Sequence, residues 1–459
     1  MGFSGSTYRK LAAIVGPEHL TRNKEDLLCY SFDATGRSFL PEVVVFPRTS
    51  EEISEIFKLA SRKKVPVIPR GSGSGMTGGA VPVQGGIVLA TSRMNAIVDI
   101  DTDNLIARVE PGVILADIHE AVEAKGLFYP PDPASAAVCT IGGNVAECAG
   151  GPKAVKYGVT RDYILGLTAV TPTGEIIKTG VATAKGVAGY DLTRLIVGSE
   201  GTLAVVTEII LRLIAKPEAV KTMAAYFDSI ETTAQTISAL MGKGIRPRCV
   251  EYLDTACIGL LKKYRPLPMP EETRALIILE LDGDGDQVEK DALKTEKLCT
   301  DMGALEVRTA ATPADAVKIW EARKALSPIM HKLAPNKINE DIVVPISKIP
   351  EMVEIISRLQ GEFKLNIASF GHAGDGNIHC NIMYEKTDPD QSRRAHAAVD
   401  KLFEATLALG GTITGEHGVG ITKMEFLPLE IGEAERAIMK GIKQVFDPHN
   451  ILNPGKIFS

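Results

Sequence analysis

The sequence lacks the features that mark several common classes of protein. It has seven cysteines, but no two stand in a CxxC spacing, so neither a disulfide framework nor an iron–sulfur cluster is expected. It has no uncharged apolar run of about 18 residues, so direct insertion into a membrane is not expected. The net charge of −6 gives no basic field for a polyanion, which argues against nucleic acid as a partner. These absences favour a cytoplasmic protein with reduced thiols and a small-molecule substrate.

Length and glycine content indicate what the chain does contain. Its 459 residues exceed one ordinary core, so two domains are expected. Its 43 glycines exceed the usual share of about 7%, which predicts places where the backbone lies close to a ligand. From about residue 41 to 214, strand-like runs alternate with helical stretches, as in an α+β nucleotide-binding domain.

Changes in pattern along the chain predict three parts. A first domain spans residues 1–215, a second spans 216–420, and a tail at 421–459 returns to the first. Ser50, followed by two glutamates, is expected to cap a helix N-terminus. LNIASFGHAGDGNIHCNIMY predicts two strands around a glycine-rich turn, followed by a helix over 393–409.

A glycine-rich loop at residues 70–79 directly follows the strand-like run VPVI. Such a loop can turn several backbone amides towards an anion. It lacks the dinucleotide fingerprint, because no helix with an acidic residue about 20 positions later follows, and it has no Walker lysine. From this loop alone, a glycine-rich hairpin that binds no ligand is an equally good interpretation.

Three of the eight histidines fall in two short segments. His372 and His379 flank the turn Gly374-Asp375-Gly376, and Glu416 precedes His417 in GTITGEHGVG. Two imidazoles and a carboxylate that leave coordination positions open are typical of a catalytic metal, and zinc, manganese or ferrous iron all suit them. The alternative is a buried histidine network that supports the glycine turns.

Four segments resemble, in order, the FAD-binding domain of the vanillyl-alcohol oxidase family, also called the PCMH-type FAD fold. They are the loop at 70–79, the segment from Pro131-Asp132-Pro133 through TIGGNVA to Gly150-Gly151, GVAGYDL, and GSEGTLAVVT. The second half resembles the C-terminal domain of FAD-linked oxidases, which include D-lactate dehydrogenases, the flavin subunit of glycolate oxidase and D-2-hydroxyglutarate dehydrogenases. The resemblance covers nearly the whole chain. It implies an α+β fold with an FAD-binding domain at 1–215 and a substrate- and metal-binding cap domain at 216–420.

The resemblance also implies which residues bind FAD. The residues that would bind the pyrophosphate are Arg70, Gly71, Ser72, Gly73, Ser74, Gly75 and Gly78. Those that would line the flavin ring and ribityl chain are Pro131, Thr140, Gly143, Asn144 and Gly150. Glu200 and Val206 would lie near the adenine, and Asn453 would reach the flavin ring from the C-terminal tail. No histidine lies between His19 and His119, so the FAD should be non-covalent. A plain docking tail is the alternative for Asn453 and Lys456.

For the reaction centre, the resemblance implies a divalent metal and three further side chains. The implied metal ligands are His372, His379 and Glu416. His417 would be the catalytic base, Asn381 would lie near the substrate, and Arg323 would bind the substrate carboxylate through two hydrogen bonds. For Arg323, the alternative is a surface arginine in a charged helix.

The sequence therefore predicts an FAD- and metal-dependent dehydrogenase that oxidises a D-2-hydroxy acid to the 2-oxo acid. D-Lactate or glycolate is favoured, because Asn339-Glu340-Asp341 stands where dicarboxylate-using relatives carry a lysine. Electrons would pass to an external carrier, such as an electron-transfer flavoprotein or an iron–sulfur subunit. The sequence allows a homodimer but does not predict the oligomeric state. The alternatives are a flavoprotein oxidase that uses oxygen on another alcohol, a D-2-hydroxyglutarate dehydrogenase, and a non-catalytic binding or electron-relay subunit.

Overall fold

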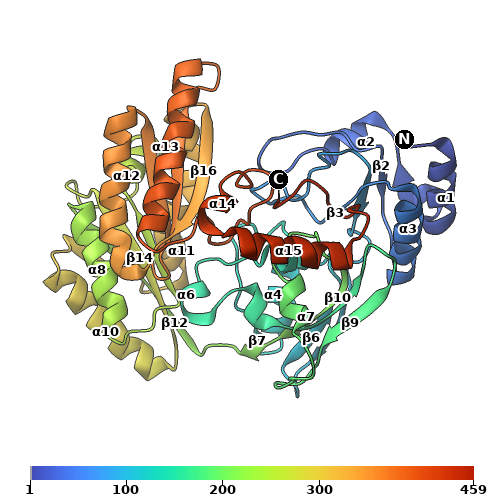
Figure 1. The fold of residues 1–459 in the computed structure, drawn as a ribbon. Coiled ribbons are helices and arrows are strands. Elements are labelled where there is room, and N and C mark those ends of the chain that lie inside the picture. Colours follow the sequence, from blue (N-terminus) through green and yellow to red (C-terminus); the bar gives the residue numbers. More distant parts are fainter. Residues whose placement is uncertain (1–2, 459) are drawn as a thin grey trace. The chain divides into compact units, whose positions relative to one another are not determined.

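The computed structural model describes residues 3–458, which mix helices and strands in two compact units (Figure 1). Unit 1 consists of Met1–Gly151, Gly158–Lys216 and Glu416–Ser459. Unit 2 consists of Pro152–Tyr157 and Pro217–Gly415. The chain thus leaves unit 1 for about 200 residues and then comes back to it.

Within the described residues, unit 1 contains three sheets. In the first, with strand order β1-β2-β4-β3, strands β2, β4 and β3 are parallel and β1 is antiparallel. The second, β5-β6-β10-β8-β9, is antiparallel, and β11 pairs with β7 in the third. The strands are β1 Leu20–Thr21, β2 Val43–Val45, β3 Val67–Arg70, β4 Ile87–Ala90, β5 Ile97–Asp101, β6 Ile106–Val109, β7 Leu127–Phe128, β8 Ile164–Val170, β9 Ile176–Gly180, β10 Val205–Arg212 and β11 Ile214–Ala215. The helices are α1 Gly5–Val15, α2 Lys24–Cys29, α3 Ser50–Lys63, α4 Leu115–Glu123, α5 Ile141–Glu147, α7 Leu192–Ile196, α14 Leu427–Glu430 and α15 Glu433–Phe446.

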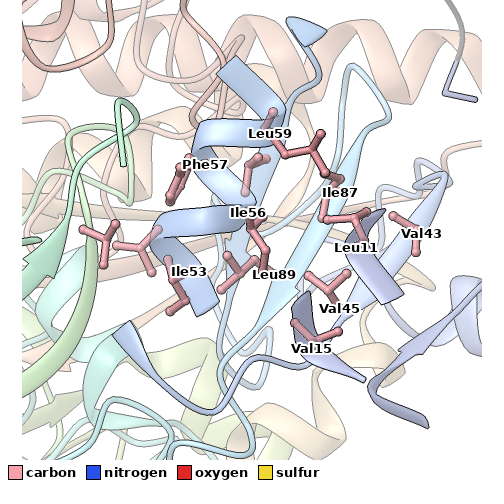
Figure 2. Close-up of a cluster of buried hydrophobic side chains, with 14 of the residues drawn as sticks. Leu11, Val15, Val43, Val45, Ile53, Ile56, Phe57, Leu59, Ile87 and Leu89 are labelled. Carbon is pink, nitrogen blue, oxygen red and sulfur yellow. The ribbon is translucent and has the colours of Figure 1, made fainter. Parts of the chain in front are cut away.

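The core next to the glycine loop lies where α1 and α3 pack on the parallel strands (Figure 2). On α3, Ile53, Ile56, Phe57 and Ala60 follow the spacing of one helix face and are wholly buried. They meet apolar side chains of β2 and β4, such as Leu89. This packing fixes β3 and β4, between which the glycine loop runs.

The N-terminus of α3 corrects one expectation. Thr49, not Ser50, is the cap, and its hydroxyl accepts a hydrogen bond from the Glu52 amide at 3.2 Å. Ser50 is already helical, and its hydroxyl donates to Thr207 instead. Both residues carry a hydroxyl, so the local pattern does not separate them.

Unit 2 is built on one antiparallel sheet of seven strands, in the order β15-β12-β14-β13-β17-β18-β16. Helices α9 and α11 pack with the apolar side chains of one face of the sheet, and α12 packs between α8 and α13. The strands are β12 Ala219–Phe227, β13 Cys249–Leu253, β14 Ala275–Gly283, β15 Glu306–Thr309, β16 Asn336–Val343, β17 Asn366–His372 and β18 Asn377–Tyr384. The helices are α6 Ala154–Tyr157, α8 Ile230–Gly242, α9 Thr255–Tyr264, α10 Gly285–Asp301, α11 Pro313–Ile329, α12 Ile349–Phe363 and α13 Pro389–Ala408.

The predicted pair of strands around a glycine turn is present as β17 and β18, and the helix expected over 393–409 is present as α13. His372 ends β17, and His379 lies on β18 opposite Phe370. On its other side β17 pairs with β13, where Glu251 stands opposite His372. Strand pairing therefore brings three polar side chains from distant parts of the chain to neighbouring positions of one sheet.

The segment after unit 2 joins the parallel sheet of unit 1. The amide of Asn453 donates to the carbonyl of Val67, and Leu452 bridges to the same residue. Among residues 3–458, no helix has both the length and the apolar character needed to cross a membrane.

Candidate functional site

The glycine loop after β3 presents a row of unpaired backbone donors. From Ser72 to Ala80, no backbone N–H donates a hydrogen bond within residues 3–458. Unpaired amides are uncommon in folded proteins, and a run of them in a glycine-rich loop is suited to an anion. The pyrophosphate of FAD is such an anion, so the loop fits the cofactor at this point.

Close packing explains two glycines of this loop. A Cβ at Gly71 would collide with the Thr140 hydroxyl, and a Cβ at Gly73, where φ is +72°, would collide with the guanidinium of Arg70. Arg70 is buried, its Nη1 donates to the Ala80 carbonyl at 3.4 Å, and burial lowers its pKa. The structure thus brings Arg70, Gly71, Gly73 and Thr140 together, with a positive charge inside the loop.

Unpaired carboxylate oxygens lie near the same loop. Oε2 of Glu147 and Oδ2 of Asp33 are buried and have no hydrogen-bond partner among the described residues. Burial, followed by the charges of Glu200 and Asp33, raises the pKa of Glu147 well above its ordinary value. An unprotonated carboxylate oxygen accepts hydrogen bonds, and a protonated Glu147 can also donate one, so these groups suit the hydroxyl and N–H groups of a flavin nucleotide. The surroundings of the loop thus offer buried carboxyl groups in addition to the backbone donors of the loop.

Two other predicted FAD residues, Glu200 and Asn453, form hydrogen bonds with backbone groups. Both carboxylate oxygens of Glu200 accept backbone N–H groups, from Val419 and Gly420. The Asn453 side chain donates to the carbonyls of Gly79 and Glu200, both at 2.9 Å. These two residues therefore join the C-terminal segment to the loop.

The remaining predicted FAD residues lie on α5 or in other strands and loops of unit 1. Gly143 donates its amide to the Thr140 hydroxyl at 3.3 Å, and Asn144, which follows it in α5, is buried. The Pro131 carbonyl lies 3.0 Å from Nε2 of His119. Val206 lies on β10 opposite Ala169. A Cβ at Gly150 would lie only 2.9 Å from Oε2 of Glu416, so the position has no room for a side chain.

In unit 2, the two predicted histidine ligands face each other. Their Nε2 atoms are 3.4 Å apart, and both residues are buried, with 5% of His372 and 6% of His379 exposed. Two nitrogens bound to one tetrahedral metal at about 2.0–2.1 Å each are about 3.3–3.4 Å apart. The pair therefore has the spacing that a single divalent cation needs.

Glu251 belongs to the candidate site, although the sequence interpretation did not include it. Its wholly buried carboxylate bonds Nδ1 of His372 through Oε1 and accepts from Nε of Arg323 at 2.7 Å through Oε2. Burial raises the pKa of Glu251, but the charges and hydrogen bonds of His372 and Arg323 outweigh burial and lower it to about 2. An ionised Glu251 is an acceptor, so in the neutral form of His372 the proton sits on Nδ1 and Nε2 keeps its lone pair for a metal. The available signal was one acid inside the apolar run CVEYL.

Arg323 projects from α11 beside this pair. Its guanidinium lies over the Phe370 ring, 4.2 Å from the centroid, and its Nε is held by Glu251. Its Nη1 and Nη2 atoms have no acceptor within residues 3–458. The end of the guanidinium is thus available for a carboxylate, and only 15% of the side chain is exposed, which is less than expected for an ordinary surface arginine.

Two further predicted residues, Asn381 and Glu416, lie on or next to elements of this sheet. Asn381 is wholly buried on β18, where its Nδ2 donates to the His379 carbonyl and its Oδ1 accepts from Asn339 at 2.8 Å. Asp341 on β16 accepts the amide of Gly415 through both its backbone carbonyl and Oδ2, each at 2.9 Å. Glu416, the third predicted metal ligand, follows Gly415 directly and is the first residue of the last stretch of unit 1.

His417, the predicted base, lies in unit 1, where its carbonyl accepts the Thr77 hydroxyl at 3.0 Å. Its Nε2 is 4.0 Å from Oε1 of Glu416. The backbone of His417 is therefore tied to the glycine loop.

Comparison with known proteins defines the class that this fold and these loops belong to. Residues 41–180 match an FAD binding domain, and residues 216–457 match the C-terminal domain of FAD linked oxidases. The structure of p-cresol methylhydroxylase with substrate bound is similar over 99% of this chain and 98% of that chain, with a TM-score of 0.81 and 18% identity. The protein is thus a flavin-dependent oxidoreductase with the predicted α+β, PCMH-type architecture.

More specifically, the chain belongs to the FAD-linked oxidase family. It is 44% identical over 451 residues to the glycolate oxidase subunit GlcD of Bacillus subtilis, which covers 98% of this chain and 96% of the relative. It is 36% identical over 425 residues to the D-lactate dehydrogenase of Anaerostipes hadrus, which covers 91% of this chain and 89% of the relative. The family predicted from the sequence is confirmed.

Proposed function

We propose that this protein is an FAD- and metal-dependent dehydrogenase that oxidises a D-2-hydroxy acid, with D-lactate or glycolate favoured, to the 2-oxo acid. The observation that carries the proposal is the facing pair of Nε2 atoms, 3.4 Å apart, with Arg323 held beside it by Glu251. The relatives named as a D-lactate dehydrogenase and a glycolate oxidase subunit support this substrate class.

His372, His379 and Glu416 would hold the metal, which could be zinc, manganese or ferrous iron. Bound there, a divalent cation would lower the pKa of a substrate hydroxyl, and FAD would take the hydride from the substrate carbon. Glu251 keeps Nε2 of His372 deprotonated for this purpose. The FAD is proposed to be non-covalent.

Four side chains would bind the substrate or act on it. Arg323 would bind its carboxylate with the two Nη groups, since Nε is engaged by Glu251. His417 would take the hydroxyl proton as general base. Asn381 would lie close to the bound acid, with its amide fixed by Asn339. Asn339 is neutral, which supports a substrate with one carboxylate over a dicarboxylate such as 2-hydroxyglutarate.

The electrons would leave the flavin for an external carrier. The described part of the chain contains seven free cysteines and no disulfide, and none of them stands in a CxxC spacing. The name of the Bacillus subtilis relative describes a subunit, which supports a partner that accepts electrons, such as an iron–sulfur subunit or an electron-transfer flavoprotein.

Stopped-flow reduction of the bound flavin tests the proposal. D-Lactate or glycolate should bleach the flavin faster than L-lactate, and His417→Ala should slow reduction by roughly 10²- to 10⁴-fold. Arg323→Ala should also raise the half-saturating substrate concentration. His396→Ala, an exposed histidine on α13, is the matched control and should behave like the wild type.

Metal content is measured on the same samples. His372→Ala should lose the metal and keep the flavin absorbance. Faster reduction by L-lactate, or an unchanged rate in His417→Ala, would contradict the proposed geometry. Rapid reoxidation by oxygen without any carrier would favour an oxidase instead.

A further inference from the structure

At the end of the glycine loop, the peptide groups are hydrogen-bonded through their carbonyls but, among the described residues, not through their N–H groups. The carbonyls of Thr77, Gly78 and Gly79 all accept hydrogen bonds, whereas the N–H groups from Ser72 to Ala80 have no partner within residues 3–458. In a planar trans peptide, the C=O and the following N–H point in opposite directions. Whatever holds these carbonyls therefore also sets the direction of the unpaired amides.

All three carbonyls are held by the C-terminal segment. The Thr77 carbonyl accepts the amide of Ile421 at 2.8 Å. The Gly78 carbonyl accepts Nζ of Lys456 at 2.5 Å, and the Gly79 carbonyl accepts Nδ2 of Asn453 at 2.9 Å. Each donor is more than 340 positions away from the loop along the chain.

Lys456 is the least expected of these donors. It is buried, with 4% of the residue exposed, and its Nζ also donates to the Val81 carbonyl at 2.6 Å. Removing an ammonium group from water is costly unless hydrogen bonds and opposite charges compensate. Burial lowers the pKa of Lys456 to about 8, and the loop carbonyls together with the carboxyl groups of Asp33 and Glu200 offset part of this effect.

Asn453 is equally specialised. Its φ is +45°, in the left-handed region where asparagine is several-fold enriched, and its side-chain amide donates to two carbonyls in the interior. A leucine or an alanine would fill the space but would donate no hydrogen bond. The position therefore suits a donor that can adopt left-handed backbone geometry.

We propose that Lys456 and Asn453 are positioning residues for FAD: they fix the loop carbonyls so that the opposite amides point at the FAD phosphates. They bind the loop from behind and need not touch the cofactor. The inference depends on FAD binding and not on the proposed hydroxy-acid reaction, so the two can fail separately.

The test measures binding of cofactor fragments to full-length protein freed of FAD. Lys456→Met removes the ammonium group, and Asn453→Gly removes the side-chain amide while tolerating the positive φ. Each should weaken FAD and ADP binding by about 10- to 100-fold, the effect of losing a hydrogen bond to a charged or oriented group. Riboflavin, which lacks phosphate, should bind the variants as it binds the wild type.

Lys440→Met, an exposed lysine of α15, is the matched control and should bind both fragments normally. Circular dichroism and thermal unfolding show whether each variant is folded. Lys456→Arg keeps the cation and several donors, so it should recover part of the ADP affinity. Wild-type ADP affinity in both Lys456→Met and Asn453→Gly would overturn the proposal. Equal loss of ADP and riboflavin would also overturn it, because that result describes general support of the fold.

Discussion

At the scale of single residues, Glu251 connects two side chains with different tasks. One carboxylate oxygen fixes the tautomer of His372 and the other holds the guanidinium of Arg323. A glutamine in the same place has one acceptor and one donor, so it can satisfy only one of these two donors. Metal affinity and substrate-carboxylate affinity are therefore expected to depend on the same residue.

Glu251→Gln should weaken metal binding by about 10- to 100-fold, the usual effect of losing the partner that orients a ligand histidine. Titration of the purified protein with Mn²⁺ or Zn²⁺ measures this directly. Glu280→Gln is the control, since Glu280 is a buried carboxylate on β14 that accepts from Thr222, Arg248 and Trp320. It should lose stability but keep its metal affinity. Equal metal affinity in Glu251→Gln and the wild type would refute the role.

Glu147 should make stability depend on pH. Its pKa is raised by burial first and then by Glu200 and Asp33, so the folded protein keeps a proton that the unfolded chain has released. Stability should therefore fall as pH rises from about 4.5 towards the folded pKa, by at most about 1.4 kcal/mol per pH unit for one proton. Below the unfolded pKa this penalty is absent.

Glu147→Gln should remove that slope and be more stable than the wild type at neutral pH. Urea unfolding at pH 5 to 8.5, with and without FAD, measures the difference. Glu404→Gln, on the exposed surface of α13, is the control and should follow the wild type. A stability difference that does not grow with pH would show that Glu147 is ionised at no penalty in the folded protein.

Residue spacing in the sequence predicted that some side chains of the candidate site lie close together, but it did not predict others. His372 and His379 are seven positions apart across a glycine turn, so their proximity follows from local sequence. Glu251 is 121 positions from His372, and only the pairing of β13 with β17 brings them together. The cap of α3 was misplaced by one residue, since Thr49 and Ser50 offer the same chemistry.

At the scale of elements, the β17–β18 hairpin positions the proposed metal site. Gly376 in its turn has a φ of +88°, and a Cβ there would collide with the Val344 carbonyl. Gly376→Ala should therefore destabilise the protein by about 2–5 kcal/mol through strain and crowding, and should weaken metal binding. Chemical unfolding and metal titration measure the two effects.

Gly361→Ala is the matched control for the hairpin prediction. Gly361 lies within α12, and a Cβ there would meet nothing within 4 Å. It should be neutral or stabilising by up to about 1 kcal/mol, because alanine favours a helix over glycine. A Gly376→Ala protein as stable as Gly361→Ala would contradict the packing of the turn.

The local sequence pattern predicted whether a segment is a helix or a strand, but it did not predict which strands pair with each other. Alternation and glycine turns identified β17, β18 and α13. The order of the seven-stranded sheet places β13 between β14 and β17, a pairing that joins strands separated by several helices. Long-range pairing depends on the total burial of both faces, which no single segment encodes.

At the scale of the whole molecule, unit 1 is assembled from three separate stretches of chain, and the last follows all of unit 2. The sequence indicated the cofactor family because four glycine-rich segments occur in a set order. It did not reveal that the C-terminal segment holds the carbonyls of the first of these segments. That arrangement depends on hydrogen bonds such as the one between Gly78 and Lys456, 378 positions apart.

The discontinuous build of unit 1 has a consequence for biosynthesis. Ribosomes add residues in order, at about 5–20 per second, so the 378 positions from Gly78 to Lys456 take roughly 20–75 s to translate. During that interval a nascent chain has the glycine loop but lacks the groups that orient it. Cofactor loading is therefore expected only after unit 2 has been synthesised, and a truncated translation product should emerge without flavin.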